Sequence, residues 1–274
     1  MPNNMDDKKI LFYDLDGTLL KTDKTISDED IRALRKWKEA GNILAITTGR
    51  SVQGTEMICK GYGLLEKGDY LITFQGSLIM EADTKRVIAA DSLPPADVML
   101  VLNALTDAGI YAHTFDLDKI YIPYECDDFF KYNSIAHEDY EIIDDISVLE
   151  GKVLPKVICI AYDDPKRLYD FQESFRDKEP GRFNSFFSQP MFLEYCKEGI
   201  NKGTGLKRLA KHLGIPKERT IAVGDERNDI YMMKAAGTGC CIGSGHPDAK
   251  AAADYVTKRS NDESAVSEII ERFL

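Results

Sequence analysis

Two carboxylates near the N-terminus stand where a buried strand should end. The run Ile10–Tyr13 is apolar, and Asp14 and Asp16 follow it, with Gly17 directly after them. Neighbouring carboxylates repel each other unless something cationic compensates for their charge. A divalent metal would compensate for this charge and would draw an anionic phosphoryl group to the same place. One carboxylate could then attack phosphorus, and the other could transfer a proton.

Further polar groups follow other predicted strands and fit the same anionic substrate. Thr48 can donate a hydroxyl and Lys202 a full positive charge to the transferring group. Asp225 adds a carboxylate after a later strand, so Asp14 and Asp225 offer Mg²⁺ the hard oxygen ligands it prefers. Gly17 lets the backbone turn tightly, with N–H groups aimed at phosphate oxygens. Taken singly these are ordinary turn or surface residues; as a set they predict phosphoryl transfer.

The elements that must position these groups alternate between strand and helix. The first third predicts strand Ile10–Tyr13, a helix capped by Ser27, strand Ile43–Thr47, helix Val52–Tyr62 and strand Tyr70–Phe74. The pattern returns as helix Lys202–Leu213, strand Thr220–Val223, helix Asn228–Ala236, strand Cys240–Ile242 and a last helix from Ser264 to Phe273. This rhythm predicts a parallel sheet covered by helices, with ligands bound beyond the carboxyl ends of its strands.

The middle of the chain follows another pattern. Tyr111–Phe115 and Ile120–Pro123 flank a predicted hairpin turn, among helices and further short strands. The predicted fold class is therefore α/β, a Rossmann-like parallel-sheet core with an inserted α+β cap domain. The core would comprise residues 1–92 and 190–274, and the cap residues 93–189. One large α/β domain with long excursions is the alternative.

The composition of the chain argues against several kinds of binding partner and site. A net charge of −11 argues against binding nucleic acid or an anionic membrane, since both favour a basic face. The six cysteines form no CxxC pair, so buried thiols are expected rather than zinc ligands or disulfides. No apolar run approaches the ~18 residues of a membrane span. We expect a cytoplasmic monomer whose partner is a small phosphorylated molecule.

Four stretches of the chain resemble the motifs of the haloacid dehalogenase superfamily. In order and spacing they are similar to its Cof-type sugar-phosphatase branch, which carries a cap of class IIB between the second and third motifs. The stretches are Asp14–Leu20, Thr48–Arg50, Lys202–Gly203 and Gly224–Asp229. The resemblance covers essentially the whole chain. It implies Mg²⁺-dependent hydrolysis of small phosphorylated metabolites, sugar phosphates above all, through an aspartyl-phosphate.

The resemblance also assigns a role to each motif residue. Asp14 would be the nucleophile and Asp16 the general acid and base. Mg²⁺ would be held by Asp14, the main-chain carbonyl of Asp16, and Asp225. The remaining roles are phosphate binding by Gly17, Thr48, Gly49, Lys202 and Asn228, and support of the metal shell or of Lys202 by Asp229. Thr47 is the alternative hydroxyl to Thr48, although strand alternation and the resemblance favour Thr48.

Two stretches depart from the family pattern, and two other functions stay open. Gln75-Gly76 stands where members usually carry Asn-Gly, and Gly243–Gly245 stands in place of Gly-Asn-Ala. Both departures concern substrate detail more than the chemistry. The alternatives are a phosphomutase and a phospho-accepting regulator such as a response-regulator receiver. The large cap argues against the first. Asp16 and the insertion argue against the second, because receivers are single small domains.

Overall fold

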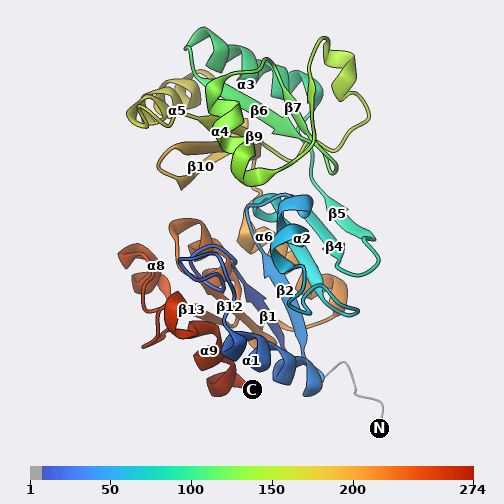
Figure 1. Cartoon of the computed structure of the whole chain (residues 1–274), viewed down its shortest axis with the longest axis vertical. Coiled ribbons are helices and arrows are strands. Elements are labelled where there is room, and N and C mark those ends of the chain that lie inside the picture. Colours follow the sequence, from blue (N-terminus) through green and yellow to red (C-terminus); the bar gives the residue numbers. More distant parts are fainter. Residues whose placement is uncertain (1–7) are drawn as a thin grey trace. The chain divides into compact units, whose positions relative to one another are not determined.

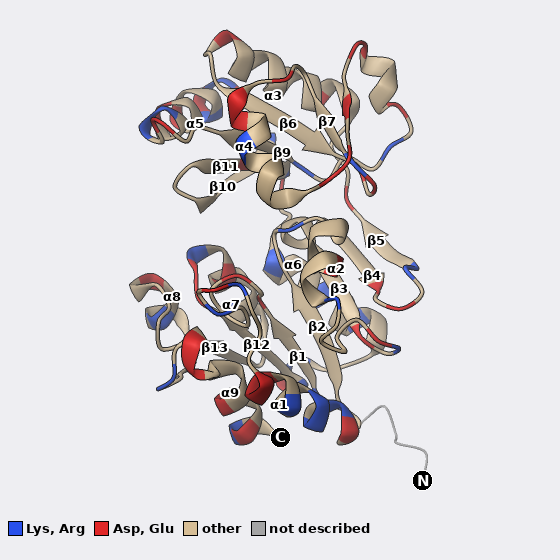
Figure 2. Ribbon diagram, viewed as in Figure 1, with Lys and Arg blue, Asp and Glu red and all other residues tan. Residues whose placement is uncertain are grey.

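The computed structural model describes residues 8–274, which form two compact units. Among the described residues, the first unit contains residues 8–49, 58–89 and 201–274, and the second contains residues 50–57 and 90–200. Positive and negative side chains are interspersed within each unit (Figure 2). None of the helices described is long and apolar enough to cross a membrane.

The first unit is built on an eight-stranded sheet. Its spatial order is β14 (Tyr255–Val256), β13 (Thr238–Cys241), β12 (Thr220–Gly224), β1 (Ile10–Tyr13), β2 (Ile43–Thr47), β3 (Tyr70–Thr73), β4 (Leu78–Glu81) and β5 (Val87–Ala90). The pairs from β14 to β3 are parallel, and β4 returns antiparallel to β3. The predicted α/β class with a parallel-rich central sheet is therefore confirmed. The buried strand β1 lies at its centre, hydrogen-bonded to β2 and β12 (Figure 1).

Helices complete this unit because their apolar faces need cover. They are α1 (Asp28–Glu39), α6 (Lys202–Leu213), α7 (Ile230–Ala235), α8 (Pro247–Ala252) and α9 (Ala265–Phe273). Helix α2 (Val52–Cys59) belongs largely to the second unit. Leu206 and Leu209 of α6 share a buried core with Ile10 and Phe12 of β1. Helix α1 packs against α9. Ser27 caps α1 as predicted, with its hydroxyl accepting from the Asp30 N–H.

Several predicted boundaries differ from the observed ones. The strand predicted over Cys240–Ile242 runs instead from Thr238 to Cys241, as β13. Helix α2 ends at Cys59 rather than Tyr62, and Gly61 and Gly63 follow with positive φ angles of 88° and 69°. Strand β3 ends at Thr73, because Phe74 already belongs to a short 3₁₀ turn. The helix predicted over Asn228–Ala236 begins as the 3₁₀ turn Arg227–Asp229 and becomes α-helical only at Ile230.

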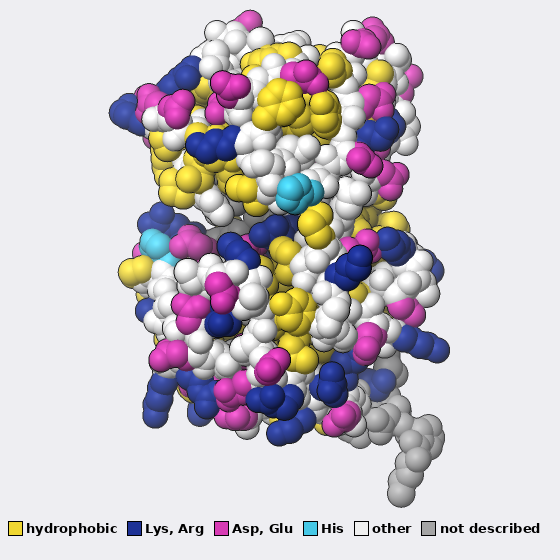
Figure 3. All heavy atoms as spheres, viewed as in Figure 1, with side chains coloured by type: hydrophobic (Ala, Val, Ile, Leu, Met, Phe, Trp, Pro, Cys, Tyr) yellow, Lys and Arg dark blue, Asp and Glu magenta, His cyan; other side chains and the backbone are white. Residues whose placement is uncertain are grey.

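The second unit has its own six-stranded sheet. The spatial order is β10 (Phe183–Gln189), β11 (Phe192–Lys197), β9 (Val157–Ile160), β6 (Tyr111–Phe115), β7 (Ile120–Ile122) and β8 (Tyr140–Ile142). Its helices are α3 (Pro95–Asp107), α4 (Asp127–Ala136) and α5 (Lys166–Lys178). Side chains of α3 and α5 share one apolar core with the strands. Hydrophobic side chains also reach the surface of this unit (Figure 3), among them Phe130, Ile135 and Tyr140.

The predicted end of the insertion at residue 189 is wrong. Strand β11 pairs with both β10 and β9, so Phe192–Lys197 lies inside the smaller sheet. The turn at Pro190 joins two strands of one hairpin and does not connect the two units. The chain returns to the first unit only at Asn201, the N-cap of α6. The first boundary, predicted after residue 92, lies after Ala89.

A buried ion pair in the smaller sheet joins Lys156, directly before β9, to Glu194 of the neighbouring strand β11. Lys156 Nζ lies 3.0 Å from Glu194 Oε2, and the two side chains are only 5% and 3% exposed. Removing one partner of such a pair leaves an uncompensated charge in the interior, which typically costs about 3–5 kcal/mol. We therefore expect Lys156→Met to lower the free energy of unfolding of this unit by that amount in urea titrations.

The surface pair Lys166–Asp170 provides the matched control, because both of its side chains are mostly exposed. Lys166→Met should change the same free energy by less than about 1 kcal/mol. Adding Glu194→Leu to Lys156→Met should recover most of the loss. An equal effect of the buried and the exposed substitution would contradict this account.

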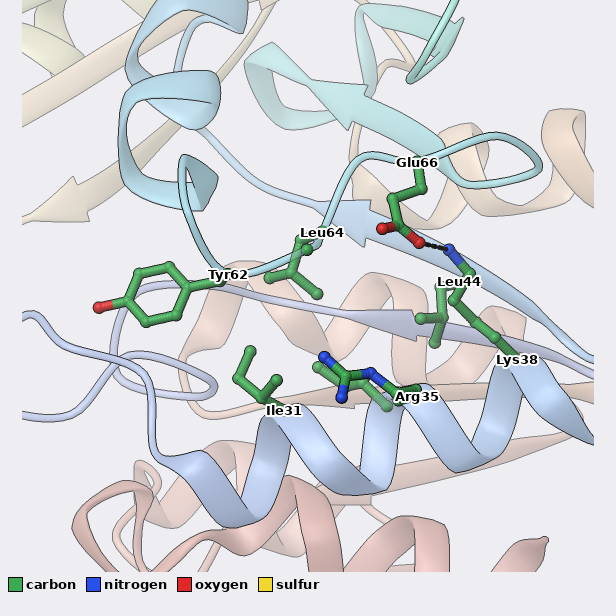
Figure 4. A pocket seen from close by; sticks show the side chains of 9 residues that line it. Ile31, Arg35, Lys38, Leu44, Tyr62, Leu64 and Glu66 are labelled. Carbon is green, nitrogen blue, oxygen red and sulfur yellow. Dashed lines mark hydrogen bonds and ion pairs between the residues drawn. The ribbon is translucent and has the colours of Figure 1, made fainter.

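The pocket shown in Figure 4 lies in the first unit, lined by side chains of α1 and of the segment after α2. Its volume is about 30 Å³, with Lys38 at its rim paired to Glu66. That volume holds about one water molecule rather than a metabolite. It is therefore no candidate for a substrate site.

Candidate active site

Asp14 lies at the carboxyl end of the central strand. Its backbone N–H donates to Val223 O at 3.0 Å, which extends the β1–β12 ladder by one residue, and its side chain is buried. The chain then turns at Gly17, with φ of 80°, where a Cβ atom would lie 2.4 Å from Asp225 Oδ2. Two features therefore require glycine at position 17: the positive φ angle, and the Asp225 carboxylate, which leaves no room for a side chain.

Lys202, the first residue of α6, brings an ammonium group to two carboxylates of the site, Asp14 and Asp229. Its Nζ lies 2.6 Å from Asp14 Oδ1 and 2.6 Å from Asp229 Oδ1, and the side chain is 1% exposed. Asn201 and Thr204 form a capping box that fixes this end of the helix. A positive charge at the N-terminus of a helix is unfavourable because of the helix dipole. The two acids therefore stabilise Lys202 in this position.

Asp229 supports the site with both carboxylate oxygens. Oδ1 accepts from Lys202, and Oδ2 accepts from the backbone N–H groups of Asp225 and Glu226 at 3.0 Å each. The side chain therefore positions Lys202 and shapes the turn after β12. These contacts agree with both roles that the sequence left open for Asp229, positioning of Lys202 and support of the metal shell, and both stay predictions.

Three carboxylates converge at this point. Ligand oxygens of Asp14, Asp225 and Asp229 all lie within 4.8 Å of one another. Thr18 Oγ1 donates to Asp225 Oδ1 at 2.7 Å. The contact of Asp14 with Lys202 and that of Asp225 with Thr18 both use Oδ1, so the Oδ2 atom of each carboxylate can serve another ligand. Three carboxylates against one ammonium also leave a negative balance that a divalent cation would offset.

Burial and mutual repulsion set the ionisation of this cluster. Burial, opposed in part by Lys202, raises the pKa of Asp14 to about 7. Burial and the charges of Asp14 and Asp229 raise the pKa of Asp225 to about 8. The same carboxylates outweigh burial at Lys202 and raise its pKa above the usual value. The raised pKa values mean that Asp14 and Asp225 do not readily ionise together. A bound cation would favour their ionised forms.

Asp16 occupies a different environment from Asp14. Its Oδ1 lies 3.1 Å from Lys24 Nζ, and its side chain is 32% exposed. The carboxylate is not among the three that converge. This placement agrees with a side chain that faces a leaving group, whereas metal binding through the Asp16 carbonyl stays a prediction.

The predicted phosphate-binding residues lie on neighbouring loops of the first unit. Thr48 follows β2 directly and donates its N–H to Ile72 O at 2.8 Å. Asn228 Nδ2 donates to Gln75 Oε1 at 3.3 Å, and Gln75 Nε2 lies against Gly49. The structure therefore places Gly49 and Asn228 against the side chain of Gln75, and Thr48 O accepts from the Gln75 backbone N–H.

Two contributors were missed from the sequence. Thr18 holds Asp225, and its place just after Gly17 in the first motif was a usable signal. Gln75 was noted only as a departure from the family pattern, and the structure shows its contact with Asn228. The second departure from the family pattern packs against the turn that carries Asp225, because a Cβ at Gly245 would lie 3.1 Å from Asp225 O.

Comparison with known proteins identifies the family. A family model described as haloacid dehalogenase-like hydrolase matches residues 11–270. The chain belongs to this family. The resemblance seen in its four motifs is thereby confirmed.

Named relatives are phosphatases. The chain is 28% identical over 243 residues to HMP-PP phosphatase of Escherichia coli strain 55989, covering 89% of this chain and 87% of that protein. It is 26% identical over 271 residues to 5-amino-6-(5-phospho-D-ribitylamino)uracil phosphatase YitU of Bacillus subtilis strain 168, covering 96% and 97%. A haloacid dehalogenase-like hydrolase from Bacteroides thetaiotaomicron has the same fold, with a TM-score of 0.86, 28% identity and coverage of 97% and 100%.

Proposed function

We propose that this chain is a Mg²⁺-dependent phosphatase that hydrolyses small phosphorylated metabolites, sugar phosphates above all, through an aspartyl-phosphate on Asp14. The observation that carries the proposal is the convergence of Asp14, Asp225 and Asp229 around Lys202 at the carboxyl end of the sheet. Such a site suits a phosphoryl group, because phosphoryl transfer depends on positioning and on compensation of charge.

The chemistry follows from the placement of the side chains. A carboxylate oxygen of Asp14 attacks phosphorus, the bond from phosphorus to the leaving oxygen breaks, and Asp16 gives that oxygen a proton. Water then attacks phosphorus and gives a proton to Asp16, and the bond from phosphorus to the Asp14 oxygen breaks. Inorganic phosphate leaves, and the Asp14 carboxylate is free again. Lys202 orients the Asp14 carboxylate, and Thr48 and Asn228 would donate hydrogen bonds to the phosphoryl oxygens.

The donor set fits Mg²⁺. It offers carboxylate oxygens, with one on Asp14 and one on Asp225 uncommitted, and the described residues place no His or Cys in the acidic cluster. Hard oxygen ligands of this kind suit Mg²⁺, which keeps several waters. When bound, the ion would offset the charges of the carboxylates and of the phosphoryl group.

Metal removal is expected to abolish turnover. Exhaustive chelation should stop hydrolysis of p-nitrophenyl phosphate, and added Mg²⁺ should restore it. Asp225→Ala should raise the Mg²⁺ concentration for half-maximal activity by about tenfold or more, since loss of even an outer-shell partner costs about 10–100-fold in metal affinity. Asp248→Asn is the control, because Asp248 is exposed and paired with Arg227. Full activity after chelation would refute the metal assignment.

The second unit is proposed as a cap that selects the substrate. All residues assigned to phosphoryl transfer lie in the first unit, so recognition of the rest of the substrate has to come from elsewhere. The names of the relatives indicate phosphatases with different substrates. A screen across hexose, pentose and polyol phosphates, nucleotides, and flavin and pyridoxal phosphates tests the proposal. Activity on nucleotides or cofactors with none on sugar phosphates would reject the sugar-phosphate assignment, and no hydrolysis of any phosphate ester would reject the function.

A further inference from the structure

The loop after β3 has an uncommon backbone conformation. Phe74, Gln75 and Gly76 have φ angles of 49°, 58° and 105°, and all three residues are buried. Residues other than glycine, asparagine and aspartate seldom adopt the left-handed region. Such strain persists only where surrounding contacts fix it, and it gathers at functional sites. The contacts of this loop therefore indicate its purpose.

Those contacts join two parts of the candidate site. The Gln75 N–H donates to Thr48 O at 3.0 Å, and a Cβ at Gly49 would lie 2.4 Å from Gln75 Nε2. A Cβ at Gly76 would lie 2.3 Å from the carbonyl oxygen of Asn201, the residue before Lys202. The loop is thus packed between the turn after β2 and the start of α6, and both carry groups proposed to bind phosphate.

The Gln75 side chain also contacts a third part of the candidate site, the side chain of Asn228. Its Oε1 accepts from Asn228 Nδ2 at 3.3 Å, whereas Asn228 Oδ1 is buried and has no hydrogen-bond partner within the described part of the chain. A carboxamide has two N–H donors on one side and an acceptor on the other. The acceptor on Gln75 engages one donor and leaves the second for an anion. Without it, Asn228 could turn its oxygen toward the phosphate.

We propose that Gln75 is a positioning residue of the phosphate site, which holds the Asn228 carboxamide with an N–H group toward the anion. The inference rests on the proposed function and deepens it, because it gives a role to a residue outside the four motifs. It requires that the contributions of Gln75 and Asn228 to phosphate binding are coupled.

A double-mutant cycle tests this coupling. The affinity of the Mg²⁺-loaded protein for inorganic phosphate is measured by calorimetry for the parent, Gln75→Leu, Asn228→Ala and the double variant. Hydrogen bonds to charged groups are worth about 10–100-fold in affinity, so each single substitution should weaken binding by roughly tenfold or more. The double variant should bind no worse than Asn228→Ala alone, because Gln75 acts through Asn228.

Two further variants keep the test decisive. Gln75→Asn tolerates the left-handed backbone but is one methylene shorter, so it should fold and show the same loss and the same masking by Asn228→Ala. Gln172→Leu on α5 is the matched control. Its amide donates to Ser185 in the second unit, and its removal should leave phosphate affinity unchanged.

The outcomes separate the two proposals. Losses that multiply in the double variants, or Gln75 variants that bind phosphate as the parent does, would overturn the positioning role. Turnover of p-nitrophenyl phosphate by the parent is assayed in parallel, and its absence would overturn the proposed function instead. A parent that does not bind phosphate would overturn both.

Discussion

Asp14→Asn is expected to abolish phosphatase turnover while leaving the fold intact. The substitution is nearly isosteric, and it removes the carboxylate that would attack phosphorus. Activity on p-nitrophenyl phosphate should fall below about one-hundredth of the parent value, since loss of a nucleophile removes a whole covalent step. Steady-state rates with Mg²⁺ provide the measurement, and residual activity above that level would end the assignment of the nucleophile.

The same variant should be more stable than the parent at neutral pH in the absence of metal. Burial raises the pKa of Asp14 from 3.8 to about 7, so the folded parent holds a proton that the unfolded chain releases. Stability of the parent should therefore fall as pH rises from about 4 to 7, by up to a few kcal/mol at about 1.4 kcal/mol per pKa unit. The Asp14→Asn protein has no carboxyl group to ionise at this position, so its stability should not fall in this way. The difference between the urea midpoints of the two proteins should grow over that range and be absent at pH 4.

Lys202→Met should have the second largest effect, on both activity and stability. It leaves Asp14 and Asp229 buried without the ammonium that lies 2.6 Å from each. Removing one electrostatic partner of the reacting groups typically costs about 100- to 1,000-fold in rate. Breaking a buried ion pair costs about 3–5 kcal/mol of unfolding free energy, measured here with metal chelated.

Lys207→Met is the control for this effect. Lys207 lies on the same helix but is exposed, so its replacement should change neither the rate nor the urea midpoint appreciably. A Lys202→Met protein as stable as the Lys207 variant would show that Asp14 and Asp229 need no counterion. An unchanged rate would remove Lys202 from the mechanism.

The sequence alone determined the elements that carry the motifs. Ile10–Tyr13, Ile43–Thr47 and Lys202–Leu213 have the predicted bounds, because continuous apolar runs and helical periodicity are local signals. Since carboxyl ends of parallel strands share one edge, Asp14 and Asp225 could be expected to meet there without coordinates. The resemblance of the motifs to the family implied that Lys202 joins them.

Only the tertiary structure decided the contacts between segments that are distant in sequence. The sheet to which Phe192–Lys197 belongs depends on its pairing partners β9 and β10, and a proline at position 190 looks the same in a hairpin turn as in a linker. Likewise, Asp229 accepts a hydrogen bond from Lys202, and Gln75 accepts one from Asn228. No periodic pattern in the sequence predicts either contact. Burial makes these polar contacts necessary, because a buried charge or amide without a partner is costly. Burial is a property that only the assembled core confers.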